Sequence, residues 1–315
     1  MKGFEVILEN ITLLSAMMAV GFICVKSGYI SGEVKNALSK IIVRVTLPLL
    51  IVNALTNIEL TPARAKNAAL VAVLALAVVA VMYAVGALTA RLWRLELPAA
   101  VIHRCMMAFG NVAFLGYPLI RAIFGDEGFF YAAVYEFVND IFVWTFVVCK
   151  LNSIGADGKI PLKTQIKNAV NPCTIAFFVS FALMLLKIRP TGLALGLTEG
   201  IGSMTTPLSM IFIGGTLAEV RLGGLRRLGS FSAVVLIKML AAPMLLALLT
   251  RALPLSEVAR GAFILQVGMP SQTILSVLTL EYGGDSVYTS EGILITTLAA
   301  LITLPAVYYV LCTIG

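Results

Sequence analysis

The sequence predicts an all-α membrane protein with ten transmembrane helices, arranged as two inverted repeats of five. Three observations lead to this fold class. The chain is 60% hydrophobic and only 12% charged, with a mean hydropathy of +0.99, whereas about 25% of a soluble domain is charged. Its apolar residues form runs that are long enough to cross a bilayer, such as the uncharged stretch 67–90. Finally, landmarks of the first half recur in the second.

Charged and turn-rich positions divide the chain into ten apolar segments. These segments cover residues 5–25, 37–57, 67–91, 98–123, 128–150, 168–187, 195–219, 231–252, 257–281 and 288–313. Only one connection is long, polar and basic, and it lies at mid-chain. We therefore expect residues 1–150 to form the first five-helix repeat, 151–167 a cytoplasmic linker and 168–315 the second repeat.

The repeat is visible as three pairs of residues at nearly the same separation. Pairs 158 or 159 positions apart are Pro48 and Pro207, Gly110 and Gly268, and Gly125 and Gly283. Because five is an odd number, the second unit begins on the opposite side of the membrane from the first. Inverted repeats of this kind are typical of secondary transporters.

The orientation follows from the loop charges. Lys and Arg are more frequent in the loops near 26–40, 91–97, 150–167, 219–230 and 281–291 than in the opposite loops. Loops rich in these residues face the cytoplasm. We expect a multi-pass protein of the cell (inner) membrane with both termini extracytoplasmic, and the net charge of +7 needs no nucleic-acid partner.

Two stretches with helix-breaking residues lie inside predicted spans. They are "FGNVAFLGYPLI" at 109–120 and "VGMPSQTIL" at 267–275. Irregular backbone at membrane depth persists only when it is buried in protein or lines a cavity. Paired breaks in two inverted halves mark a transporter's binding site, where the free N–H groups of half-helices attract an anion. The predicted substrate-binding residues are Gly110, Asn111, Pro118, Gly268, Pro270, Ser271 and Gln272.

The chain resembles the auxin efflux carrier family over nearly its whole length. The pattern GN-x-x-F-x-G-x-P-L is matched by Gly110, Asn111, Phe114, Gly116, Pro118 and Leu119. Further similar stretches are "VYEFVNDIFVWTFVV" at 134–148, "NPCTIAF" at 171–177, "TPLSMIFIGGTLA" at 206–218 and "GMPSQT" at 268–273. As in bacterial members, there is no long central loop.

This resemblance implies a crossed fold like that of sodium/bile-acid symporters, in which broken helices four and nine cross. It also implies an elevator-type movement of a transport domain against a scaffold of segments one, two, six and seven, and a homodimer. The expected substrates are small carboxylates such as malate, malonate or auxin-like acids, in contact with Asn111, Pro118 and Pro270. Many members have Ser or Thr just before the asparagine, where this chain has Phe109 and Gly110.

Charged residues inside spans are functional candidates by default. Glu136 and Asp140 share one helix face, with Asn139 beside them. Two carboxylates on a buried face repel each other, which suits ion or proton coupling, although both could instead pair with basic residues and hold the bundle together. Lys238 either extends to the interface or neutralises a carboxylate.

Other functions remain open or are excluded by missing motifs. A cation/proton antiporter of similar fold would use Asn139 and Asp140, and a sodium-coupled organic-anion symporter is a close variant. The motifs HExxH and GxSxG, a P-loop and a Cys/His cluster are all absent, so we expect no enzyme, no cofactor and no metal site. The expected partners are a small organic anion, the lipid bilayer and a second copy of the chain.

Overall fold

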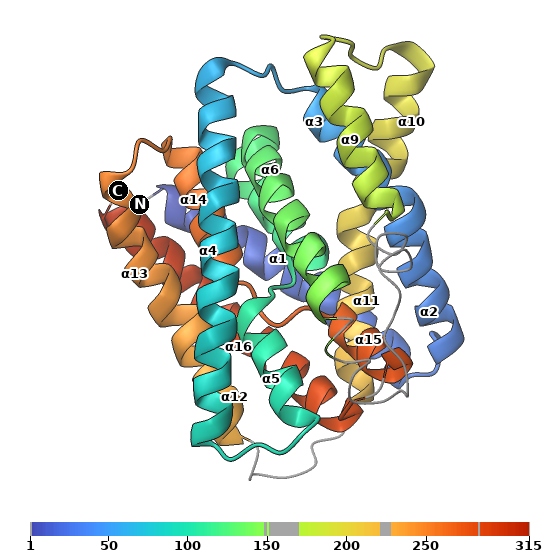
Figure 1. Cartoon of the computed structure of the whole chain (residues 1–315). Helices are drawn as coiled ribbons and strands as arrows, with labels where there is room; N and C mark the ends of the chain where they lie inside the picture. Colours follow the sequence, from blue (N-terminus) through green and yellow to red (C-terminus); the bar gives the residue numbers. More distant parts are fainter. Residues whose placement is uncertain (1, 148–149, 151–169, 221–227, 283, 315) are drawn as a thin grey trace.

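The computed structural model describes residues 2–147, 150, 170–220, 228–282 and 284–314 (Figure 1). Helices make up nearly all of this part of the chain, and it contains no strand beyond one isolated bridge. The all-helical prediction is therefore confirmed. The predicted linker 151–167 and the landmark Gly283 lie outside the described residues.

The helices of the first half follow the predicted segments closely. They are α1 (Lys2–Lys26), α2 (Gly32–Ile41), η1 (Ile42–Thr46), α3 (Leu47–Thr56), α4 (Pro62–Leu92), α5 (Ala99–Ala108), η2 (Val112–Gly116), α6 (Tyr117–Phe142) and η3 (Val143–Val147). The start of α4 shows the local chemistry. The Thr61 side chain accepts a hydrogen bond from the Arg64 N–H at 3.3 Å, and Pro62, which has no N–H to leave unpaired, follows it.

The second half contains a similar series. It consists of α9 (Pro172–Leu185), α10 (Gly192–Ser203), α11 (Thr205–Glu219), α12 (Leu228–Ala233), η5 (Val234–Ala241), α13 (Ala242–Leu249), η6 (Thr250–Ala252), α14 (Glu257–Val267), α15 (Ile274–Tyr282) and α16 (Ser286–Ile314). Here η1, η2, η3 and η5 are wider π-helical turns, and η6 is a 3₁₀ turn.

Six helices in the described residues are long and apolar enough to span a membrane. They cover Leu8–Lys26, Gly32–Thr56, Pro62–Leu92, Gly192–Glu219, Leu228–Ala252 and Ser286–Thr313. The apolar helices Ala99–Ala108 and Pro172–Leu185 are shorter. The predicted spans 98–123 and 257–281 each consist of two shorter helices with irregular backbone between them, so neither reaches spanning length as one helix.

Within α6, the chain reverses at Gly125. This glycine has a φ of 65°, in the left-handed region that side chains with a Cβ rarely adopt. The turn separates residues 117–124, which belong to the fourth predicted segment, from residues 126–142, which belong to the fifth. Arg121 and Asp126 form an ion pair of 2.8 Å beside the turn.

The helices pack in two groups. In one group α1 lies along α11, and α3 lies along α9 and α10. In the other, α4 packs on α5 and α6, α14 on α6, and α13 on α14 and α16. Figure 1 shows α3, α9 and α10 on one side of the molecule and α4, α12, α13 and α14 on the other.

Contact between α1 and α11 depends on glycine. A Cβ at Gly214 would lie 1.8 Å from the Met18 carbonyl oxygen, and one at Gly21 would lie 2.2 Å from the Ile211 carbonyl oxygen. The two backbones therefore touch directly. Close approach at small residues is the usual way in which membrane helices associate, because lipid offers no hydrophobic drive between them.

Candidate functional site

The first interruption lies between α5 and η2. The backbone leaves the helix at Phe109, which is extended with φ −108° and ψ 128°. The N–H of Asn111 then donates to the Pro270 carbonyl at 2.8 Å, rather than to its own helix. Gly110 permits this approach, since a Cβ there would lie only 2.9 Å from the Met269 Cβ.

The second interruption lies between α14 and α15 and meets the first. Gly110 pairs with Ser271 in a single antiparallel bridge. The Asn111 amide donates from Nδ2 to the Thr273 Oγ1 at 2.7 Å. The Ser271 N–H donates to the Thr296 Oγ1 of α16 at 3.1 Å. The polar backbone groups of one interruption are thus satisfied partly by the other.

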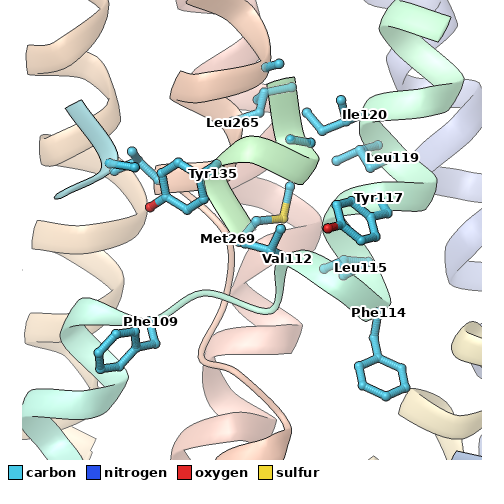
Figure 2. Packing of buried hydrophobic residues seen from close by; sticks show 14 of the residues in the cluster. Phe109, Val112, Phe114, Leu115, Tyr117, Leu119, Ile120, Tyr135, Leu265 and Met269 are labelled. Atoms are coloured by element: carbon cyan, nitrogen blue, oxygen red, sulfur yellow. The ribbon is translucent and has the colours of Figure 1, made fainter. Parts of the chain in front are cut away.

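Figure 2 shows the first interruption passing from Phe109 to Val112, with Met269 of the second interruption beside Val112. Two helices start at this point, because η2 begins at Val112 and α15 at Ile274. The first N–H groups of a helix have no intrahelical partner and carry partial positive charge. Two such ends therefore lie close together inside the protein.

A cavity of about 100 Å³ lies against the interruptions and between the two helix groups. Asn111 and Gln272 form part of its wall on the side of the interruptions. Glu136 and Asp140 of α6 line it next to them, and Asn171 faces it from the start of α9. This volume accommodates several water molecules or a small solute. The structure thus brings members of both predicted sets to one cavity, Asn111 and Gln272 for the substrate and Glu136 and Asp140 for coupling.

A third helix also begins at the cavity. Asn171 caps α9 by accepting a hydrogen bond at Oδ1 from the Thr174 N–H, at 3.0 Å. Cys173 and Thr174 line the cavity, and Asp140 interacts with Asn171. The positive end of α9 is therefore directed at the same space as the starts of η2 and α15.

Aromatic side chains make up much of the remaining wall. They are Phe114, Tyr117, Phe137, Trp144 and Phe177. The rings of Phe137 and Phe177 stack with their centroids 5.2 Å apart. An apolar lining with a few polar groups is typical of small-molecule sites, where the apolar part fits a carbon skeleton and the polar groups fix its orientation.

The acidic residues of α6 are largely enclosed. Glu136 is 5% exposed, and its Oε2 accepts a hydrogen bond from the Nδ2 of the fully buried Asn139 at 3.3 Å. None of the ion pairs found among the described residues includes Glu136 or Asp140. The interpretation that they hold the bundle together through salt bridges therefore has no support in this part of the chain.

Several buried amide atoms lack a hydrogen-bond partner in the described residues. Among them are Asn111 Oδ1, Asn139 Oδ1 and Gln272 Oε1. Native proteins rarely leave such atoms unpaired, and those that remain so often mark the position of a ligand or water. Asn111 and Gln272 line the cavity, so their unpaired oxygens lie beside it.

Comparison with known proteins identifies the family to which the chain belongs. A family model described as "membrane transport protein" matches residues 6–308. The chain belongs to the membrane transport protein family. An uncharacterized transporter of Methanothermobacter thermautotrophicus is 25% identical over 305 residues, which cover 94% of this chain and 96% of that protein. The resemblance to auxin efflux carriers is thereby confirmed.

The other residues predicted to bind the substrate are not among those that line the cavity. Gly110, Pro270 and Ser271 hold the two interruptions together. Pro118 is buried in the first turn of α6, after the interruption rather than within it, and it does not line the cavity. A Cβ at Gly268 would make only ordinary contacts, at 3.5 Å from Pro243.

The sequence did not point to Thr273 and Thr296, whose hydroxyl oxygens accept the hydrogen bonds from Asn111 Nδ2 and from the Ser271 N–H. It also did not point to Gln266, which is fully buried in the last turn of α14, two residues before the second interruption begins at Gly268. A Cβ at Gly116 would lie 2.5 Å from Gln266 Oε1. A polar residue two positions before a glycine inside an apolar span was the available signal for Gln266.

Proposed function

We propose that the protein is a secondary transporter of small organic anions, and that the anion binds in the cavity beside Asn111 and Gln272. The observation that carries this proposal is the meeting of two interrupted helices at a buried cavity. The starts of η2, α15 and α9 direct positive dipole ends at this cavity without a fixed charge. Membership of a transporter family supports transport over catalysis.

An arrangement of ten spans in two inverted repeats is supported by matched helix ends. The α5 helix ends at Ala108 and α14 at Val267, 159 positions later. In Figure 1, α4 runs from top to bottom, whereas α12 and α13 run upward. If the halves are repeats, α1 corresponds to α9 and α3 to α11. The contact of α1 with α11 then has its counterpart in the contact of α9 with α3.

An elevator-type mechanism is supported by the position of the cavity. One wall comes from α3, η1 and α9, and the opposite wall comes from η2, α6, η3 and the second interruption. We propose that α1, α2, α3, α9, α10 and α11 form the scaffold. The anion would travel with the interrupted helices past this scaffold, and alternating access would follow from that movement.

Binding can be measured on the purified protein with a panel of carboxylates that includes malate, malonate and indole-3-acetate. A ligand of the folded state raises the melting temperature by mass action. Carboxylates that raise it should then be taken up by vesicles that contain the protein. If folded protein neither binds nor moves any carboxylate of the panel, the proposal fails.

The two carboxylates beside the anion site predict proton coupling. An anion entering next to ionised Glu136 and Asp140 would be repelled in a medium of low dielectric constant. Protons that neutralise these carboxylates remove the repulsion, so we expect carboxylate and protons to enter together. The paired change Glu136→Gln and Asp140→Asn should abolish substrate-driven acidification of the vesicle lumen, measured with an internal pH dye, while carboxylate binding persists.

Glu199→Gln serves as the matched control, since Glu199 is an exposed acidic residue on α10, away from the cavity. It should leave acidification unchanged. Acidification that continues at its normal rate in the paired variant would show that these carboxylates carry no coupling proton.

The second candidate function is a cation/proton antiporter. The observation in its favour is that Asp140 lines the cavity while Asn139 is buried beside it. Sodium-driven proton movement that requires no carboxylate and disappears in Asp140→Asn would establish it. Carboxylate-dependent proton movement would favour the anion transporter.

A further inference from the structure

Lys238 lies inside the protein, in η5, with only 2% of its surface exposed. Its Nζ donates to the carbonyl oxygen of Met106 at 2.9 Å and to that of Phe109 at 2.6 Å. Both carbonyls belong to the end of α5, where the first interruption begins. Lys238 therefore neither extends to the membrane interface nor, among the described residues, joins an ion pair.

A helix that ends inside a membrane leaves carbonyl groups that need hydrogen-bond donors from elsewhere in the protein. The carbonyl groups at the end of α5 beyond Cys105 lack the partners that a continuing helix would supply, and together they carry partial negative charge. In lipid, water cannot satisfy them. An ammonium group supplies both the donors and the opposite charge, which offsets part of the large cost of placing a charge at that depth.

The helix that carries Lys238 is locally irregular. Its π-helical turns are followed by Pro243, which has no N–H to donate to the Met239 carbonyl. Pro243 and that carbonyl lie next to Gly268, where the second interruption starts. A π-helical segment often marks a functional position, and this one places a cation where both interruptions meet.

Backbone carbonyl oxygens are also the ligands that channels use to replace the hydration shell of an alkali cation. We propose that the Lys238 ammonium is a tethered cation, which occupies the place that a diffusible coupling cation such as Na⁺ would take at the meeting of the interruptions. This inference rests on the proposed transport function, because it assigns the cation of the transport cycle to the chain itself. The binding site then needs no sodium, and removing the ammonium creates a requirement for a cation.

The test compares melting temperatures of the purified protein in sodium chloride, potassium chloride and choline chloride at equal ionic strength, about 0.15 M. No carboxylate is added, so the result is independent of whether the proposed substrate class is right. The wild type should melt at the same temperature in all three salts. Lys238→Ala leaves space beside the two carbonyls, and sodium or potassium should raise its melting temperature by about 3 °C or more over choline.

Two further variants complete the test. Lys238→Gln, which adds a neutral oxygen ligand, should respond like Lys238→Ala. Lys35→Ala removes a lysine that pairs with Glu219 at the surface, and it should show no preference among the salts. Recovery of a Lys238 variant in sodium chloride but not in choline chloride would also support the proposal.

Three results would overturn it. One is a specific sodium effect on the wild type. Another is the absence of any salt preference in folded Lys238→Ala and Lys238→Gln. The third is failure of both variants to fold in every salt, which would show that a diffusible cation cannot replace the ammonium. Carboxylate transport by the wild type would be unaffected by any of these results, so the two proposals fail separately.

Discussion

Replacing Asn111 with alanine is expected to reduce carboxylate affinity at least about tenfold, while the melting temperature of the unliganded protein falls only slightly. The change removes an amide that lines the cavity and has an unpaired oxygen. It also removes the side-chain hydrogen bond to Thr273. The backbone contact that joins the interruptions, from the Asn111 N–H to the Pro270 carbonyl, stays intact.

Thr273→Val provides the matched control for this prediction. It removes the same hydrogen bond but leaves the amide of Asn111 at the cavity. Affinity, measured by calorimetric titration or by the ligand-induced rise in melting temperature, should therefore fall much less than in Asn111→Ala. Equal losses of affinity in the two variants, or equal losses of affinity and folded yield in Asn111→Ala, would mean that Asn111 holds the structure together rather than the substrate.

The largest effect on stability is expected for Gly214→Leu. Any Cβ at this position would lie 1.8 Å from the carbonyl oxygen of Met18, so α1 and α11 would have to separate along the contact that joins them. Because the obstacle is backbone, no side-chain rotation relieves it. We expect a loss of about 3 kcal/mol or more of folding free energy, seen as loss of the monodisperse peak in size-exclusion chromatography.

Gly196→Leu on α10 is the corresponding control. A Cβ at Gly196 meets no atom within 4 Å, so the same substitution should leave the elution profile and melting temperature nearly unchanged. A folded Gly214→Leu protein with a normal melting temperature would contradict the close packing of α1 on α11.

Much of the helix pattern could be predicted from the sequence, because burial in lipid imposes long uncharged runs that composition alone reveals. The interruptions were also predictable, since Gly110 and Pro270 are the residue types that disfavour a regular helix most. Their exact extent was harder to foresee. Pro118 suggested a longer first interruption, but the helical backbone already begins at Val112 with the wider turns of η2, and Pro118 follows directly after them.

The hydrogen-bond partners of the polar side chains could not be predicted from the sequence. Asn111 and Thr273 are 162 positions apart, and Lys238 lies 129 positions from Phe109. Such pairs form only when helices distant along the chain pack together, and no local pattern encodes the packing. The prediction for Lys238 considered water and carboxylates as its partners, whereas backbone carbonyls freed by the interruption satisfy its ammonium.

By itself, the sequence determined that this chain enters a membrane as helices, that two of those helices are interrupted, and that it resembles auxin efflux carriers. Hydrophobicity and backbone chemistry are local properties, so they can be read along the chain. Only the tertiary structure decided that the interruptions touch, that Glu136 and Asp140 face the same cavity as Asn111, and that Lys238 caps α5. Those are relations between distant segments, and the packing of the helices in space fixes them.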